Sequence, residues 1–318
     1  MNANRNLKLD GLKFVMIFLV VLGHLTYNDY GIGFNRIIYS FHMPVFVFLS
    51  GYFTSQNTNK KRQIRWLWQT LFIYIIAQFA HFILEFVICY AQAVLNHETF
   101  DATSLLSLKN LISPRLALWY LVCLMYWRMS IWFIFQNTSD LKLLGFSCAF
   151  ALASGLIPID HEFAFQRAFS FFPFFVIGMI IRKREFMPKL YRVPYIEALI
   201  ILLIGLVIAR YLPTYMPKFH YSNWHQPILR VFQSCLGLVL CLCILRIAKI
   251  DLIEKFARYG VYTLWIYIGH TYIIILCQKS FAFWGITLDI VTAFTLACFI
   301  CIFFVYMAKI YHSQIDEK

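Results

Sequence analysis

Apolar segments of about 20 residues follow one another along this chain with almost no soluble stretch between them. A helix of about that length crosses the hydrocarbon core of a bilayer, which is roughly 30 Å thick. Hydrophobic residues make up 61% of the 318 residues, and a soluble domain of this length could not bury so many. The sequence therefore predicts an all-α integral membrane protein, with residues 1–318 forming a single transmembrane domain.

The apolar segments predict a polytopic bundle of about ten transmembrane helices. The third segment is longer than a bilayer requires, so it is expected to tilt or to carry an extramembrane turn. With the N-terminus inside, the cytoplasmic loops hold most of the lysines and arginines, so both termini are predicted to be cytoplasmic. The net charge of +13 is then largely a topology signal and gives no reason to expect nucleic acid as a partner. The expected spans are 11–30, 36–54, 66–93, 116–135, 142–158, 163–181, 194–212, 228–247, 260–279 and 286–309.

The cysteines and one histidine–glutamate pair offer little support for a metal or redox site. The chain has 9 cysteines scattered through apolar segments without a CxxC pair, which is typical of small buried hydrophobic residues. His81 and Glu85 lie four residues apart on one helix face, but two ligands are too few for a metal site. No metal is expected.

The first span carries ionisable residues where a membrane helix needs none. Eleven residues separate Lys13 from His24, which is about three full turns and 20° more, so both lie on one stripe about 16.5 Å apart. Asp10 lies about 40° to the other side of the stripe. Ionisable groups inside spans usually face a cavity or a pathway. The alternative is that Lys13 extends to the interface beside Asp10, while His24 bonds a neighbouring helix.

The second span supplies a partner for His24. His42 lies six residues after Arg36 and His24 lies six residues before Tyr30, so the short turn between them brings the two histidines to matching depth. A histidine titrates near neutral pH and is the usual general base for a hydroxyl, which a second histidine can orient. Pro44 leaves one backbone carbonyl without its helical hydrogen bond, which is tolerated in a membrane helix that lines a cavity. A hydrogen-bonded packing pair is the alternative.

These stretches resemble a known family. "LKLDGLKFVMIFLVVLGH" (7–24) resembles the opening signature of the acyltransferase-3 family of membrane acyltransferases, and "FHMPVFVFLSGYF" (41–53) resembles its branch related to fucose 4-O-acetylase. Three further stretches match in order: "LWYL" (118–121), "RAFSFFPFFVIGMIIRK" (167–183) and "GVYTLWIYIGH" (260–270). The resemblance implies transfer of an acyl group, usually acetyl from acetyl-CoA, to hydroxyls of surface glycans, lipid-linked sugars or small metabolites.

Two residues depart from the family pattern. Lys13 stands where the family commonly has arginine, and lysine is a point charge without the guanidinium fork. The basic entry to the third span lacks the proline that often follows it in the family. The first departure keeps the charge but changes its geometry, whereas the second affects only the shape of the helix.

Coenzyme A would place its phosphates among cytoplasmic basic residues. The positive-inside rule accounts for the same residues without any ligand. The thioester would reach His24 along the Lys13 stripe, and His24 would take the proton of the attacking hydroxyl. A covalent intermediate is not required, although an acetyl-histidine route stays open. The expected donor-binding residues are Lys13, Arg62, Arg65, Arg128, Arg182 and Lys183, and the expected catalytic residues are His24, His42, Lys13 and Asp10.

Four residues are candidates for the acceptor side. Trp119 and Tyr120 lie at the outer end of the fourth span, where sugar stacking and an interfacial aromatic belt explain them equally well. Arg167 opens one of the matching stretches, and His270 agrees with the family pattern near the middle of the ninth span. All four are expected to contact the acceptor.

The sequence therefore predicts a membrane O-acyltransferase. It would use cytoplasmic acetyl-CoA, act on a carbohydrate or glycolipid at the outer side, and lie in the lipid bilayer of a bacterial plasma (inner) membrane. The alternative is a secondary transporter or exporter of a small metabolite or glycan, because buried charges in a ten-span bundle suit one equally well. The Lys13–His24 stripe, the His42 partner and the lack of inverted repeats favour the enzyme.

Overall fold

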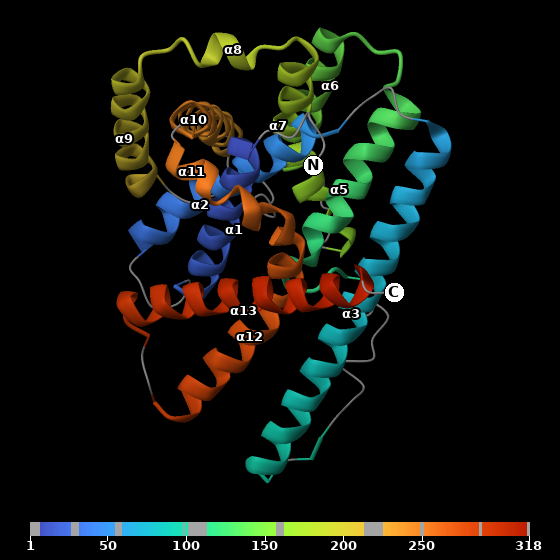
Figure 1. The fold of residues 1–318 in the computed structure, drawn as a ribbon, viewed down its shortest axis with the longest axis vertical. Coiled ribbons are helices and arrows are strands. Elements are labelled where there is room, and N and C mark those ends of the chain that lie inside the picture. Colours follow the sequence, from blue (N-terminus) through green and yellow to red (C-terminus); the bar gives the residue numbers. More distant parts are fainter. Residues whose placement is uncertain are drawn as a thin grey trace. The chain divides into compact units, whose positions relative to one another are not determined.

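A computed structural model describes residues 7–26, 32–54, 59–97, 99–100, 113–156, 162–212, 225–248, 251–285 and 288–316 (Figure 1). Within these ranges every regular element is helical. The chain divides into two compact units. Unit 1 comprises Met1–Phe53, Phe174–Met216 and Tyr221–Lys318, and unit 2 comprises Thr54–Pro173 and Pro217–His220.

Each unit has its own set of helices. Unit 1 holds α1 (Leu7–Leu25), α2 (Ile32–Tyr52), α8 (Met187–Leu190), α9 (Tyr195–Tyr211), α10 (Gln226–Ile247), α11 (Asp251–Lys255), η4 (Ala257–Tyr262), α12 (Thr263–Phe283) and α13 (Ile290–Asp316). Unit 2 holds α3 (Lys60–Leu95), η1 (Leu116–Leu118), α5 (Trp119–Met129), η2 (Ser130–Ile134), α6 (Asp140–Ala153) and η3 (Glu162–Ala164). The helix α7 (Phe165–Lys183) begins in unit 2 and ends in unit 1.

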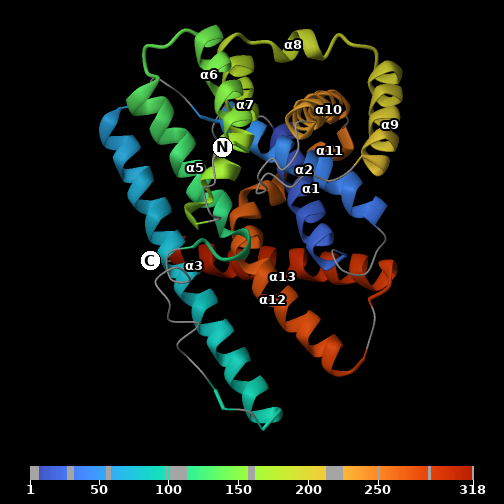
Figure 2. The same ribbon diagram turned by 180° about the vertical axis from the view of Figure 1, so that it is seen from behind.

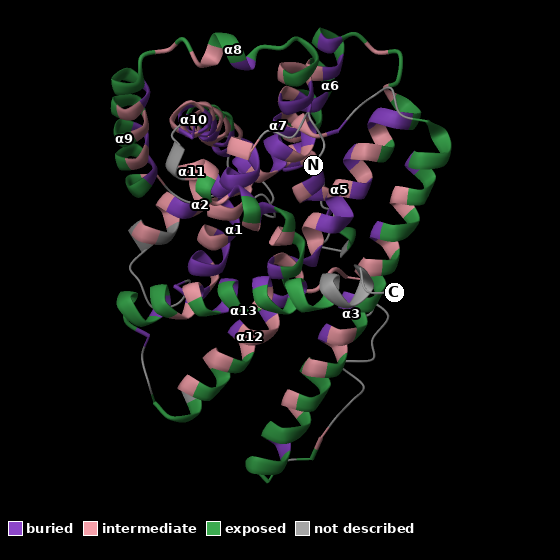
Figure 3. Ribbon diagram, in the orientation of Figure 1, coloured by how far each residue is buried: buried purple, intermediate pink, exposed green. Residues whose placement is uncertain are grey.

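The helix α1 is the buried centre of unit 1. It contacts α2, α11, η4, α12 and α13, and Figure 3 shows buried residues along most of it. Leu9, Ile17, Val21 and Leu25 are at most 1% exposed. A helix that is apolar on every side is typical of the middle of a bundle. The position of α1 brings any polar residue on it into contact with several neighbours.

Two glycines allow α2 and α7 to cross closely within unit 1. A Cβ atom at Gly51 would collide with the backbone of Phe175, and one at Gly178 would collide with the backbone of Phe48. Small residues let membrane helices approach until their backbones touch, which maximises van der Waals packing. Any side chain larger than hydrogen at either position must separate the two helices.

Pro44 shapes the middle of α2. A proline has no N–H, so it cannot donate to the carbonyl of Ser40 one turn earlier. That carbonyl oxygen lies 3.1 Å from where a Cβ atom at Gly237 would stand, so the backbone of α10 passes close to it. The freed carbonyl therefore faces another helix of the bundle.

The helix α3 dominates unit 2 and differs sharply from α1. Its 36 residues extend about 54 Å, well beyond the roughly 30 Å of a hydrocarbon core. Large apolar side chains from Trp68 to Leu95 are exposed along it, and Figure 3 shows exposed residues along its length. The predicted third span is confirmed as unusually long.

The helix α5 ends in a π-helical turn. The N–H of Phe135 donates to the carbonyl of Ser130, five residues earlier, at 2.9 Å. Such a turn inserts one extra residue into the helical repeat and is often found at functional sites. Arg128 lies two residues before this turn.

Among the residues that the structure describes, six helical segments are long and apolar enough to cross a membrane, as expected of an all-α integral membrane protein. They match six of the expected spans. The other four expected spans coincide with α1, α2, α6 and α9; α6 and α9 have only 14 and 17 residues. Figures 1 and 2 show α13 crossing α12, the helix it contacts. Ten spans, cytoplasmic termini and a single domain over 1–318 stay predictions. The six segments are Lys60–Leu95, Leu116–Ile134, Phe165–Lys183, Gln226–Ile247, Ala257–Phe281 and Ile290–Tyr311.

Candidate active site

Three histidines from three helices meet inside unit 1. The ring of His24 on α1 lies 5.4 Å, centroid to centroid, from the ring of His270 on α12. His42 on α2 contacts the ring of Tyr39, which also lies near the ring of His24. His42 is 3% and His270 0% exposed, while His24 is half-buried. The most accessible imidazole of the group is therefore His24.

Tyr39 links two of these histidines. Its ring lies 4.8 Å from that of His42 and 6.4 Å from that of His24, with an edge directed at a face in both contacts. Tyr39 and His42 are three residues apart on α2, so they share one helix face. The four rings form a continuous row from His42 through Tyr39 and His24 to His270, and we call it the histidine row.

The backbone fixes the proton positions on two rings of the row. Nδ1 of His42 lies 2.7 Å from the carbonyl oxygen of Ile38, and Nδ1 of His270 lies 3.0 Å from that of Ile266. A carbonyl oxygen only accepts, so Nδ1 must donate its proton in both bonds. The lone pair of each ring is then on Nε2, which is the nitrogen able to accept a proton.

The helix α12 also holds the backbone of α1 at His24. Nε2 of Gln278 donates to the carbonyl oxygen of His24 at 3.3 Å. His270 lies two turns before Gln278 on the same face of α12, since eight residues amount to about 800°. The ring contact of His24 with His270 and the hydrogen bond from Gln278 together fix the position of α12 along the axis of α1.

Lys13 and Asp10 form an ion pair at the other end of α1. Nζ of Lys13 lies 2.9 Å from Oδ1 of Asp10 and 3.6 Å from the centroid of the Phe53 ring. The side chain of Lys13 is 25% exposed. The pair corresponds to the interfacial alternative that the sequence leaves open for Lys13, and a role in donor binding stays a prediction.

The basic residues expected to bind the donor lie in both units. Arg62 and Arg65 are exposed in the first turns of α3 in unit 2. Arg182 and Lys183 are exposed at the end of α7 in unit 1, where Nη1 of Arg182 donates to the carbonyl of Tyr52 at 3.1 Å. These four side chains are accessible to a phosphate.

Arg128 lies in an aromatic setting within unit 2. Its Nε donates to Oγ1 of Thr54 at 3.1 Å, and its guanidinium lies 4.0 Å from the Trp66 ring centroid. The ring centroid of Trp132, a residue of the π-helical turn, lies 5.9 Å from the same guanidinium. The electron-rich faces of both rings stabilise this half-buried cation. The sequence did not reveal Trp66 as a partner, because it lies on a different helix.

The aromatic residues proposed for the acceptor side are also in unit 2. The guanidinium of Arg167 lies 4.8 Å from the centroid of the Trp119 ring, which stacks on Phe171 at 5.8 Å and contacts Tyr120 at 6.1 Å. Trp119 and Arg167 are therefore direct neighbours, although 48 positions separate them in the sequence. Part of the Trp119 ring is already covered by protein.

The structure changes the grouping of the predicted residues. His270 was expected to contact the acceptor, and it lies beside the proposed base His24. Tyr39 was not singled out, although its position three residues before His42 was a usable signal. In the part of the chain that the structure describes, no cluster of three or more His, Cys, Asp or Glu residues could hold a metal ion.

The fold and the histidine row together define a class: a polytopic helical membrane protein with a row of imidazoles inside it. A family model described as an acyltransferase domain, acyltransferase 3, matches residues 6–309. The chain therefore belongs to the acyltransferase-3 family. Comparisons with curated proteins and with solved structures each found no match. The branch related to fucose 4-O-acetylase stays a prediction.

Proposed function

We propose that this membrane protein transfers an acetyl group from acetyl-CoA to a hydroxyl of a sugar, surface glycan or glycolipid. The observation that carries the proposal is the histidine row, in which three imidazoles meet inside a member of an acyltransferase family. Hydroxyl acylation requires removal of one proton, and a histidine is the most common side chain for that step.

His24 is the proposed general base, because it is the most accessible of the three imidazoles. It takes the proton of the acceptor hydroxyl while the hydroxyl oxygen attacks the thioester carbon. The carbon–sulfur bond then breaks, and the imidazolium returns the proton to the leaving thiolate, which restores neutral His24. His42 and His270, each with Nδ1 held by a backbone carbonyl, orient His24 and stabilise its charged form.

Basic residues are proposed to hold the phosphates of the donor. Arg62, Arg65, Arg182 and Lys183 are supported by their exposure, because an exposed cation is accessible to a phosphate. Lys13 and Arg128 already contact protein groups, so we assign them to guiding the donor rather than to its first capture. Asp10 positions Lys13.

The acceptor is proposed to lie against aromatic residues of unit 2. Trp119 and Tyr120 provide rings for sugar stacking, and Arg167 provides hydrogen-bond donors beside them.

The proposed location is the bacterial plasma membrane with both termini in the cytoplasm. Cysteine labelling from outside should then modify positions 100 and 220 but not 60, 184 or 255, and labelling of 184 would overturn this orientation.

The activity test combines the purified protein with isotopically labelled acetyl-CoA and candidate sugars, followed by mass spectrometry of the products. Substitution His24→Ala or His24→Gln should lower the transfer rate by about 10²–10⁴-fold while donor binding persists. The exposed histidine His97 is the control, and His97→Gln should transfer at the wild-type rate. A folded His24→Ala variant with undiminished transfer would rule out His24 as the base. Wild-type protein that forms no product but transports the sugar would favour the transporter.

A further inference from the structure

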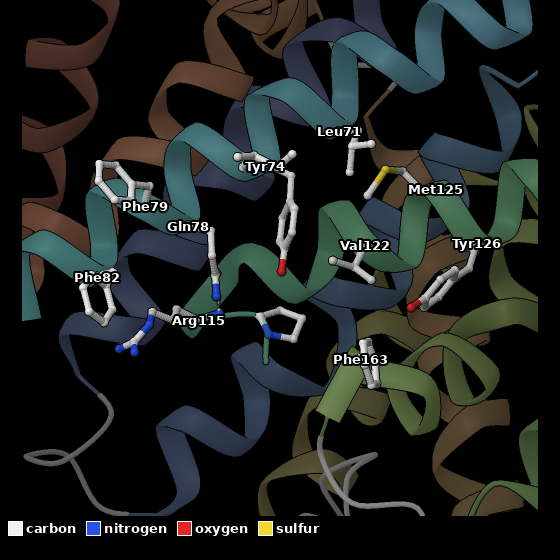
Figure 4. Close-up of a pocket in the computed structure, with 12 residues that line it drawn as sticks. Leu71, Tyr74, Gln78, Phe79, Phe82, Arg115, Val122, Met125, Tyr126 and Phe163 are labelled. Atoms are coloured by element: carbon white, nitrogen blue, oxygen red, sulfur yellow. Dashed lines mark hydrogen bonds between the residues drawn. The ribbon is translucent and has the colours of Figure 1, made fainter. Parts of the chain in front are cut away.

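Unit 2 contains a cavity that none of the residues discussed above lines. Its volume is about 590 Å³, and it lies between α3, α5 and the segment before η1 (Figure 4). Cavities of about 300–1,000 Å³ are typical of sites for small molecules. The cavity is therefore large enough for a ligand.

The walls of the cavity are apolar and one side faces lipid. Val122 and Met125 of α5 form the buried wall, at 6% and 8% exposed. Ile75 and Phe79 of α3 form the opposite rim, at 54% and 63% exposed. Because α3 is a membrane span, the exposed side of these residues faces hydrocarbon. A ligand dissolved in the bilayer can enter sideways.

One end of the cavity is polar, and hydrogen bonds and an ion pair hold its side chains in place. Nε2 of Gln78 donates to the carbonyl of Ser113 at 2.8 Å, and the N–H of Arg115 donates to Oε1 of Gln78 at 3.0 Å. The guanidinium of Arg115 pairs with Glu85 and lies 5.5 Å from the Phe82 ring. Figure 4 shows Gln78 extending from α3 towards the segment that carries Arg115.

Arg115 lies at the level of the membrane surface. It directly precedes the span Leu116–Ile134, so it marks an end of that span. Its planar guanidinium can form a bidentate pair with a carboxylate such as that of Glu85. The same fork geometry matches a phosphate. A cation at the surface and an apolar channel leading inward together match an amphiphile.

We propose that this cavity binds one hydrocarbon chain of a phosphate-bearing membrane lipid, with the phosphate at Arg115. The apolar walls suit a hydrocarbon chain and offer few partners to the amides of a water-soluble ligand. The charge of Arg115 selects an anionic headgroup, and Glu85, which is 47% exposed, can turn to solvent when the phosphate binds. The site does not depend on the proposed acyl transfer.

The chain half of the proposal is tested with a photoreactive phospholipid. The full-length protein is reconstituted into phospholipid vesicles containing a small fraction of a phospholipid with a diazirine in the middle of one acyl chain. After illumination, mass spectrometry should find label concentrated on residues 71–82 and 122–126. Ile75→Trp, which fills the rim, should lower this labelling several-fold.

The neighbouring isoleucine is a matched control for that variant. Ile76 is 52% exposed, like Ile75, but does not line the cavity. Ile76→Trp should therefore keep the wild-type labelling. Equal labelling of both variants, or label spread evenly along the lipid-facing side of α3, would overturn the proposal.

The headgroup half is tested by competition in the same assay. An unlabelled anionic phospholipid should displace the probe several-fold better than diacylglycerol with the same chains. Arg115→Gln should abolish this preference and Arg115→Lys should keep part of it, while the backbone bond to Gln78 persists in both. Thermal unfolding shows whether each variant is folded. Equal competition by the two lipids in the wild-type protein would overturn the assignment of Arg115.

Discussion

The two units keep polar groups inside a membrane in different ways. Unit 1 buries imidazoles, holds two of them through the backbone carbonyls of their own helices, and packs its helices at glycine contacts. Unit 2 carries arginines against aromatic rings and leaves a cavity beside a largely exposed helix.

The imidazoles of unit 1 and the arginines of unit 2 also differ in charge. A histidine is neutral when its proton leaves, so it can be buried with one hydrogen bond satisfied. Arginine stays charged, and burying it requires partners that stabilise a cation. The proposed function accordingly assigns proton transfer to unit 1, and the proposed lipid site assigns the binding of an anion and an apolar chain to unit 2.

The largest expected effect separates the buried histidines of the two units. We expect His42→Ala and His270→Ala each to lower the transfer rate by about 10²-fold or more, because both rings orient His24. His81 in unit 2 is also buried, at 2% exposed, and serves as the control. Rates of acetyl transfer by folded His81→Ala should match the wild type. An equal loss in all three variants would show that burial, and not the histidine row, determines the result.

The next effect compares helix packing. Gly51→Leu should lower the free energy of unfolding by about 1–3 kcal/mol or more, because the new side chain meets the backbone of Phe175. Gly145 on α6 has no atom within 4 Å of its Cβ position, so Gly145→Leu is the matched control. Thermal unfolding of the purified Gly51→Leu and Gly145→Leu variants measures the stability of each. A Gly51→Leu protein as stable as the control would contradict the close crossing of α2 and α7.

A smaller effect is expected at the half-buried Arg128 of unit 2. Arg128→Lys should lower the free energy of unfolding by about 0.5–2 kcal/mol, because a lysine covers the Trp66 face less well and loses the bond to Thr54. Tryptophan fluorescence should shift as Trp66 and Trp132 change environment. Arg210→Lys, at an exposed site in the last turn of α9, should change neither quantity.

The smallest effect on stability is expected at Lys13. Lys13→Met removes a partly exposed ion pair, so the free energy of unfolding should fall by at most about 1 kcal/mol. Acetyl transfer should nevertheless drop strongly, and Lys13→Arg should retain much of it. Turnover at the wild-type rate in Lys13→Met would reduce Lys13 to an interfacial anchor.

The sequence predicted the helices and some of the neighbours among the candidate site residues. Apolar length predicted the helical spans, and helical periodicity placed Lys13 with Asp10 and His24 with His42, because these relations are local or cross a short turn. The contact of His24 with His270 joins helices that are far apart in the sequence, and periodicity carries no information on such distances. The same reason hides the Trp66 partner of Arg128 and the cavity at Arg115.

The length of α3 has a consequence for the membrane itself. Its exposed apolar side chains run from Trp68 to Leu95, which is about 40 Å along the axis. Glu85, which pairs with Arg115 at the proposed membrane surface, lies about 26 Å from Trp68, so this part of α3 fits a hydrocarbon core of about 30 Å and the end of the helix up to Leu95 extends beyond it. A thicker bilayer covers more of the end beyond Glu85, and a thinner one makes α3 tilt or expose apolar surface to water. Bilayer thickness thereby sets the inclination of the helix that forms the rim of the cavity.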